Sequence, residues 1–218
     1  MKYDDSALNL AMYLLQIKAV KLNPRQPFTW ASGLHSPIYC DNRVTLSYPL
    51  VRTFIRQQFV ELMMQHYGKP DLIAGVATGG IAQGALVAQE MGLPFCYVRS
   101  EKKSHGMQNQ IEGVVESGQS VIVIEDLVST GKSSLLAVDA LREAGATVKG
   151  MLAIFTYQLP VAEENFKAKG CPLHTLTNYE TLIYKAIEEK YISEEDQQSL
   201  LEWRKDPQGW SDRVKSEK

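Results

Sequence analysis

The sequence predicts an α/β fold, a parallel twisted sheet flanked by helices, and two observations support it. Short apolar segments have the length and the Val/Ile content of buried strands, at residues 71–76, 95–99, 121–124 and 148–155. Helical patterns separate several of them, at residues 81–91 and 132–144. Strands that alternate with helices form parallel sheets, and ligands of such sheets bind beyond the carboxyl ends of the strands.

The part of the chain before these strands has a different pattern. Residues 4–6 offer a cap for a first helix that runs to about Ala19. Residues 28–45 predict short strands around a Ser-Gly turn. A second helix follows Pro49 and runs to about Tyr67.

Composition limits the classes of function. A net charge of −2 gives no electrostatic footprint for nucleic acid or for an anionic membrane. The chain has no apolar run of the ~20 residues that a membrane-spanning helix needs. Its start lacks the apolar core of a signal peptide, and Cys40, Cys96 and Cys171 lack zinc-site spacing. We therefore expect a cytoplasmic protein with reduced thiols and neither nucleic-acid nor membrane partners.

The segment from Val121 to Ser133, VIVIEDLVSTGKS, is the most informative about function. A buried strand ends in two carboxylates, Glu125 and Asp126, and a turn of small residues then opens a helix. The N–H groups of such a turn can converge on a phosphate, and the positive end of the helix dipole favours it. Carboxylates repel a phosphate but accept hydrogen bonds from the vicinal hydroxyls of a ribose. A nucleoside-triphosphate P-loop is rejected, because it would need a glycine in place of Asp126.

Two further stretches favour a charged substrate. The polar residues 99–113 include the cations Arg99, Lys102, Lys103 and His105 and few apolar anchors. A cationic lid of this kind can exclude water and neutralise a pyrophosphate leaving group. The ATGG sequence at residues 77–80 follows a strand, and its glycines let the backbone approach an anion closely.

These motifs resemble the phosphoribosyl-diphosphate signature of the type I phosphoribosyltransferases. Three stretches make the chain similar to the orotate phosphoribosyltransferase family of the bacterial, stand-alone kind: FTWASGLHSPIYCDNR (28–43), YVRSEKKSHG (97–106) and EWRKDP (202–207). The resemblance extends from about Leu14 to Trp203. It implies a single phosphoribosyltransferase domain over residues 1–218, with a core at about 48–176. It also implies a small hood, mainly from residues 1–45 plus part of the C-terminal region.

The resemblance implies specific roles for residues. Lys103 and Asp126 would be catalytic, and Ser129 would contact orotate. The phosphoribosyl-diphosphate donor would be bound by Arg99, Lys103, His105, Glu125, Asp126, Leu127, Val128, Ser129, Thr130, Gly131, Lys132 and Ser133. Some relatives also use an arginine near Gln158, and none stands there in this sequence.

The implied enzyme transfers ribose 5-phosphate from 5-phosphoribosyl 1-diphosphate to orotate, which gives orotidine 5′-monophosphate and diphosphate in pyrimidine (UMP) biosynthesis. Mg²⁺ is implied as the cofactor, held mainly through the donor and not by a protein metal site. A homodimer with shared active sites is also implied, because the lid of relatives reaches the neighbouring subunit. Two alternatives stay open: a phosphoribosyltransferase for another base, and a non-catalytic regulator that senses the donor.

Overall fold

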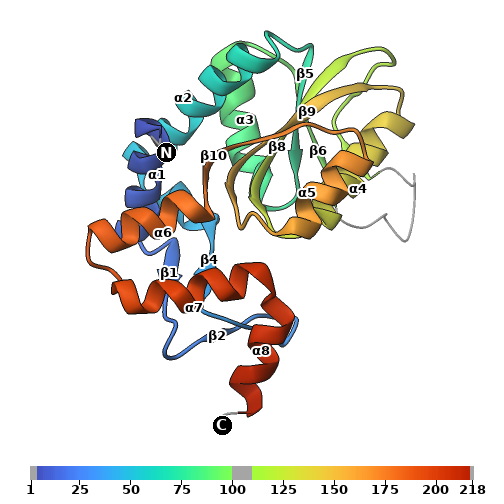
Figure 1. Ribbon diagram of the computed structural model, residues 1–218. Helices are drawn as coiled ribbons and strands as arrows, with labels where there is room; N and C mark the ends of the chain where they lie inside the picture. The colour runs from blue at the N-terminus through green and yellow to red at the C-terminus, as the bar shows by residue number, and fades with distance from the viewer. Residues whose placement is uncertain (1–3, 100–109, 217–218) are drawn as a thin grey trace.

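The computed structural model describes residues 4–99 and 110–216 and confirms the predicted fold class (Figure 1). Its centre is a six-stranded sheet in the order β10-β9-β8-β5-β6-β7. Five neighbouring strands run parallel, and only β7 pairs antiparallel, with β6. The strands are β5 (Leu72–Val76), β6 (Phe95–Val98), β7 (Ile111–Glu112), β8 (Ser120–Val128), β9 (Thr147–Thr156) and β10 (Leu173–Asn178).

Helices cover both faces of the sheet. One face packs against α1 (Asp5–Gln16), α2 (Pro49–His66) and α3 (Gly79–Met91), and the other against α4 (Lys132–Glu143) and α5 (Pro160–Ala168). Strand β8 shows the reason, because successive side chains of a strand point to opposite faces. Ile122 and Ile124 enter the first core, whereas Val121 and Val123 enter the second.

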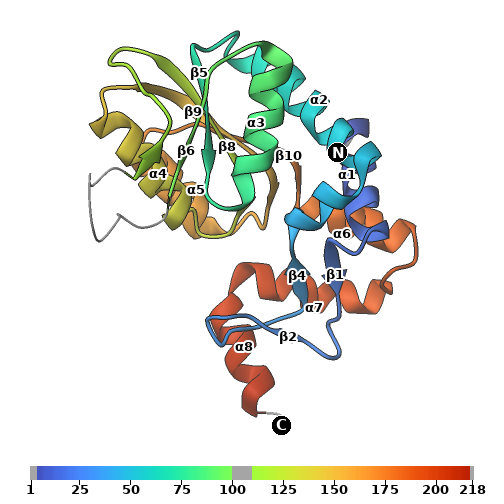
Figure 2. The same cartoon turned by 180° about the vertical axis from the view of Figure 1, so that it is seen from behind.

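A smaller layer lies to one side of the sheet, as Figures 1 and 2 both show. We call it the hood: β1 (Val20–Leu22), β2 (Phe28–Thr29), β3 (His35–Ser36), β4 (Ile38–Cys40), η1 (Asn42–Ser47), α6 (Tyr179–Glu188), α7 (Glu194–Lys205) and α8 (Pro207–Ser216). Trp30 is central to it. Its ring packs edge-on against Trp203 of α7 with centroids 5.7 Å apart, and its Nε1 donates to the Ile38 carbonyl at 3.1 Å.

Two element boundaries differ from the sequence-based predictions. The first helix ends at Gln16 and not near Ala19, because Lys18 has a φ of 57° and leaves the helical region. Strand β8 continues past Ile124 to Val128, since β9 keeps pairing with it as far as Val128↔Thr156. The two acidic residues therefore lie inside the strand and not after it. None of the helices in the described ranges is long and apolar enough to cross a membrane.

Candidate active site

The two neighbouring carboxylates point to opposite faces of β8. Glu125 follows Val121 and Val123 toward α4, where its Oε2 accepts from Ser134 Oγ at 2.8 Å. Its Oε1 accepts from the backbone N–H of Asp126 at 2.9 Å, and the residue is only 5% exposed. Burial, followed by the charge of Asp126, raises the pKa of Glu125 well above its ordinary value. The surroundings of Glu125 therefore favour its neutral form.

Asp126 points the other way, toward the start of α3, and is partly exposed. Its carboxylate lies so close to Gly79 that a Cβ on that glycine would collide with it. A Cβ on Gly80 would collide with the Ile124 carbonyl oxygen in the same way. The two glycines thus bring the loop after β5 against the acidic end of β8.

The turn after β8 presents backbone donors. Gly131 caps α4 in the left-handed conformation, with a φ of 77°. In the described part of the chain, the N–H groups of Ser129, Thr130 and Gly131 make no hydrogen bond, whereas the carbonyls of Thr130 and Gly131 are both bonded. The turn therefore combines free N–H groups with the N-terminus of a twelve-residue helix, which is the arrangement that binds phosphate.

A cavity of about 460 Å³ separates the hood from this end of β8. Its aromatic walls are Trp30, Tyr39 and Tyr157, and the rings of Trp30 and Tyr157 lie 5.3 Å apart. Leu127 and Ser129 line it from the core side. Flat aromatic walls with one hydroxyl at the rim suit a planar heterocycle.

Asn42 joins the hood to the acidic strand. It is 1% exposed, and its Nδ2 donates to the Asp126 carbonyl at 2.6 Å. The Cys40 thiol donates to Asn42 Oδ1 at 3.3 Å, and burial together with the charge of Asp126 raises the pKa of that thiol. The hood wall and the strand that carries Asp126 are therefore held in one network.

The other predicted site residues lie as follows. Arg99 follows β6 and pairs with Glu112, with Nη1 and Oε1 3.5 Å apart. Val128 is fully buried in the core, so it offers no side chain to a ligand. Lys132 opens α4, and its side chain lines a separate pocket between α4 and α5. Lys103 and His105 lie outside the described residues.

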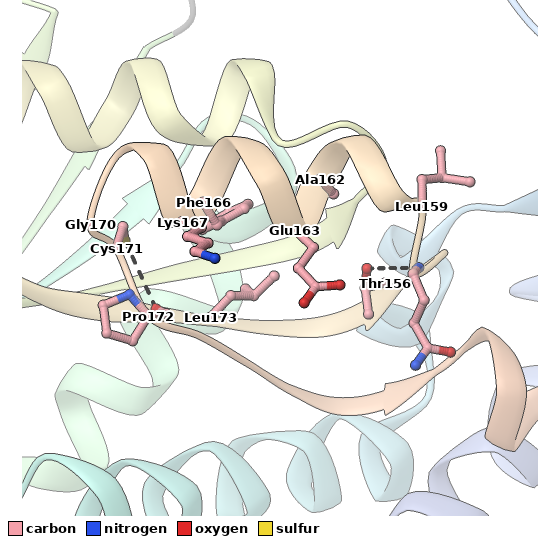
Figure 3. Close-up of a pocket in the computed structure, with 11 residues that line it drawn as sticks. Thr156, Leu159, Ala162, Glu163, Phe166, Lys167, Gly170, Cys171, Pro172 and Leu173 are labelled. Atoms are coloured by element: carbon pink, nitrogen blue, oxygen red, sulfur yellow. Dashed lines mark hydrogen bonds between the residues drawn. The ribbon is translucent and has the colours of Figure 1, made fainter.

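A second cavity, of about 600 Å³, lies between α5 and the strands β9 and β10 (Figure 3). Figure 3 shows Glu163 and Lys167 extending from α5 toward the strands beside Phe166 and Leu173. No residue lines both this cavity and the hood cavity. Of the predicted site residues in the described ranges, Leu127 and Ser129 line the hood cavity, and none lines the larger one.

Comparison with known proteins agrees with this geometry. A family model described as "Phosphoribosyl transferase domain" matches residues 50–178, so the fold and the site define a phosphoribosyltransferase. An orotate phosphoribosyltransferase of Cytophaga hutchinsonii is 54% identical over 92% of this chain and 96% of its own length. One from Bacteroides fragilis is 56% identical over 90% of this chain and 93% of its own length. This chain therefore belongs to the orotate phosphoribosyltransferase family.

Solved structures resemble the fold closely. The orotate phosphoribosyltransferase of Aeropyrum pernix aligns with a TM-score of 0.73 and 28% identity, over 84% of this chain and 99% of that one. The UMP synthase of Leishmania donovani aligns with a TM-score of 0.76 and 25% identity, over 91% of this chain and 42% of that longer chain.

Sequence reasoning missed several residues of the site. Ser134, Asn42 and Tyr157 contact or line it and were not singled out. Arg204 of α7 brings a guanidinium group to Gln158, with Nη1 3.4 Å from Oε1, although no arginine lies near Gln158 in the sequence. Among these residues, only Ser134 could have been identified from the local sequence, because it lies in the first turn of α4 on the face toward β8.

Proposed function

We propose that the protein transfers ribose 5-phosphate from 5-phosphoribosyl 1-diphosphate to orotate, forming orotidine 5′-monophosphate and diphosphate in pyrimidine (UMP) biosynthesis. One observation supports the proposal: the strand that carries Asp126 leads directly into the turn with unbonded N–H groups, and its neighbours Leu127 and Ser129 line the aromatic hood cavity. Groups suited to a phosphate, a ribose and a base, the three parts of a nucleotide, thus occur within one short segment. The relatives' names supply the particular base.

The donor's 5′-phosphate would occupy the turn formed by residues 129–133. Ser129, Thr130 and Gly131 would contribute N–H groups, and Ser133 and the helix dipole would add to them. The diphosphate would face the glycine loop at Gly79 and Gly80, since only residues without a side chain allow that loop so near β8. Leu127 and Val128 would hold the turn by their backbone, and Lys132 would add positive charge at its rim.

Asp126 would accept hydrogen bonds from the ribose hydroxyls. Its negative charge would also stabilise the positive charge that develops at C1 of the ribose, while the C1–O bond to diphosphate breaks and the bond from orotate N1 forms. Glu125 would join it by exchanging the hydroxyl of Ser134 for a ribose hydroxyl, which replaces one O–H donor with another. Because Glu125 faces α4 and is only 5% exposed, it would contact the ribose only after leaving Ser134, so Asp126 would be the main ribose ligand.

Orotate would occupy the hood cavity, stacked against the aromatic walls with Ser129 at its edge. Orotate is already an anion and needs little activation, so catalysis would come from positioning and charge neutralisation. We propose that Arg99, Lys103 and His105 neutralise the diphosphate, with Lys103 acting in the transition state. By the family resemblance, these residues would serve the neighbouring subunit of a homodimer.

Mg²⁺ would accompany the donor. The described residues contain no group of three or more His, Cys, Asp or Glu placed to hold a metal ion. We propose that the cation is held mainly by diphosphate oxygens and water, with Asp126 as a candidate carboxylate ligand beside them, because Mg²⁺ commonly binds through substrate phosphates and one or two carboxylates. When bound, it supplies charge neutralisation on the leaving group. An enzyme of nucleotide synthesis with these substrates would work in the cytoplasm.

The direct test is consumption of orotate by the purified protein. We expect loss of orotate that requires both the donor and Mg²⁺, with orotidine 5′-monophosphate as product. Adenine and hypoxanthine in place of orotate are the matched controls for another base. Tight binding of the donor without turnover would instead favour a regulator.

Shared sites have their own test. A Lys103→Ala chain and an Asp126→Ala chain should each be inactive, because each lacks one half of the proposed chemistry. An equal mixture should recover about a quarter of the activity of the same amount of wild-type protein, since half of the dimers are mixed and each mixed dimer has one intact site of two. No recovery in a sample shown to contain mixed dimers would mean self-contained subunits.

A further inference from the structure

Helix α5 contacts the turn after β8 at two consecutive residues. Asn165 Nδ2 donates to the Thr130 carbonyl at 2.9 Å. Phe166, which is buried, lies against Gly131, where a Cβ would come within 2.6 Å of its ring. Helices α4 and α5 lie side by side on the same face of the sheet in both views (Figures 1 and 2). Helix α5 therefore packs against the turn, and none of its residues lines the hood cavity.

The contact with Thr130 fixes the direction of an N–H group. In the described chain the Thr130–Gly131 peptide bond is trans, so its C=O and N–H point in opposite directions. With the carbonyl oxygen bound by Asn165, the N–H of Gly131 must point away from α5. It then faces the open side of the turn, where it makes no hydrogen bond within the described structure.

We propose that Asn165 is a positioning residue for the 5′-phosphate: it holds the Thr130–Gly131 peptide in the orientation that aims the Gly131 N–H at the phosphate. The inference rests on the proposed function, because it takes the turn to be the phosphate site. Asn165 suits this role because its amide supplies an N–H donor where an aspartate would place only acceptors. The anchoring of α5 by Ala162 and Phe166, whose side chains Figure 3 shows beside the strands, keeps that amide in place.

The role predicts a defect that is specific to phosphate. In Asn165→Ala the Thr130 carbonyl loses its partner and the peptide can rotate, so binding of orotidine 5′-monophosphate should weaken by roughly fivefold to a hundredfold. Binding of orotidine, which lacks the phosphate, should change less than about twofold. Asn165→Asp should weaken binding of the nucleotide further, because the new carboxylate repels the Thr130 carbonyl oxygen. Alanine is the best helix former, so α5 should keep its structure.

The experiment is calorimetric titration of wild type, Asn165→Ala and Asn165→Asp with the nucleotide and with orotidine, and thermal unfolding of each protein. Glu164→Gln is the matched control, since it makes an amide–carboxylate exchange on the adjacent exposed residue. The control should bind both ligands as wild type does. Equal weakening of both ligands by Asn165→Ala, or no weakening of either, overturns the inference. If wild type itself binds the nucleotide no better than orotidine, the phosphate site and the proposed function fail instead.

Discussion

Gly131 is the residue at which a single methyl group should disturb the phosphate turn most. Its φ is 77°, and a Cβ would lie 2.6 Å from Phe166 Cε2. A left-handed conformation costs an L-residue about 1–2 kcal/mol. Inserting a methyl group into a packed site costs about 1–3 kcal/mol more. The free energy of unfolding of Gly131→Ala should therefore fall by about 2–5 kcal/mol.

Gly68 separates the two causes, because its φ is 71° and a Cβ there would meet nothing within 4 Å. Gly68→Ala should lose only the conformational part, about 1–2 kcal/mol. Urea unfolding of both variants measures the difference. Titration with orotidine 5′-monophosphate should show weakened binding for the Gly131 variant alone. Equal losses of stability in the two variants would refute the reasoning, since they would mean that the Phe166 contact contributes nothing.

Three further predictions concern the acidic pair and its support. Asp126→Asn should lower kcat by about a hundredfold or more while leaving unfolding almost unchanged, because the side chain is partly exposed and its charge acts on the sugar; steady-state kinetics and thermal unfolding check this. Burial raises the pKa of Glu125, so ionising it opposes folding as pH rises above 4.5, the ordinary value. Glu125→Gln should therefore be more stable than wild type at neutral pH, with the advantage vanishing as the pH falls toward 4.5; an advantage that persists at pH 4 would contradict the shift. Asn42→Ala should destabilise the fold by about 0.5–1.5 kcal/mol, since it removes the hydrogen bond from Asn42 to the Asp126 carbonyl, and it should raise KM for orotate; unchanged urea unfolding would count against the network.

The sequence predicted the sheet because its evidence is local. Mainly apolar stretches at residues 121–124 and 148–155 identify buried strands, and strand–helix alternation predicts their parallel arrangement. Strand periodicity could also have shown that Glu125 and Asp126 face opposite sides, because adjacent residues of a strand point to opposite faces of the sheet.

The remaining features depend on contacts between distant parts of the chain. Asn42 reaches Asp126 across 84 positions, and Arg204 reaches Gln158 across 46. Neither residue has a local pattern that distinguishes it from an ordinary surface residue. Asn165 likewise stands in a helix with no unusual sequence, and only the packing of α5 against the turn reveals its role. Such residues become visible once the sheet order and the helix positions are known.

The most direct measurement is a crystal structure of the protein with orotidine 5′-monophosphate bound. We expect the phosphate on the N–H groups of Ser129, Thr130 and Gly131, the ribose hydroxyls on Asp126, and the base in the hood cavity against its aromatic walls. A nucleotide whose phosphate lies away from that turn, with Asp126 making no contact to the ribose, would contradict the proposed function.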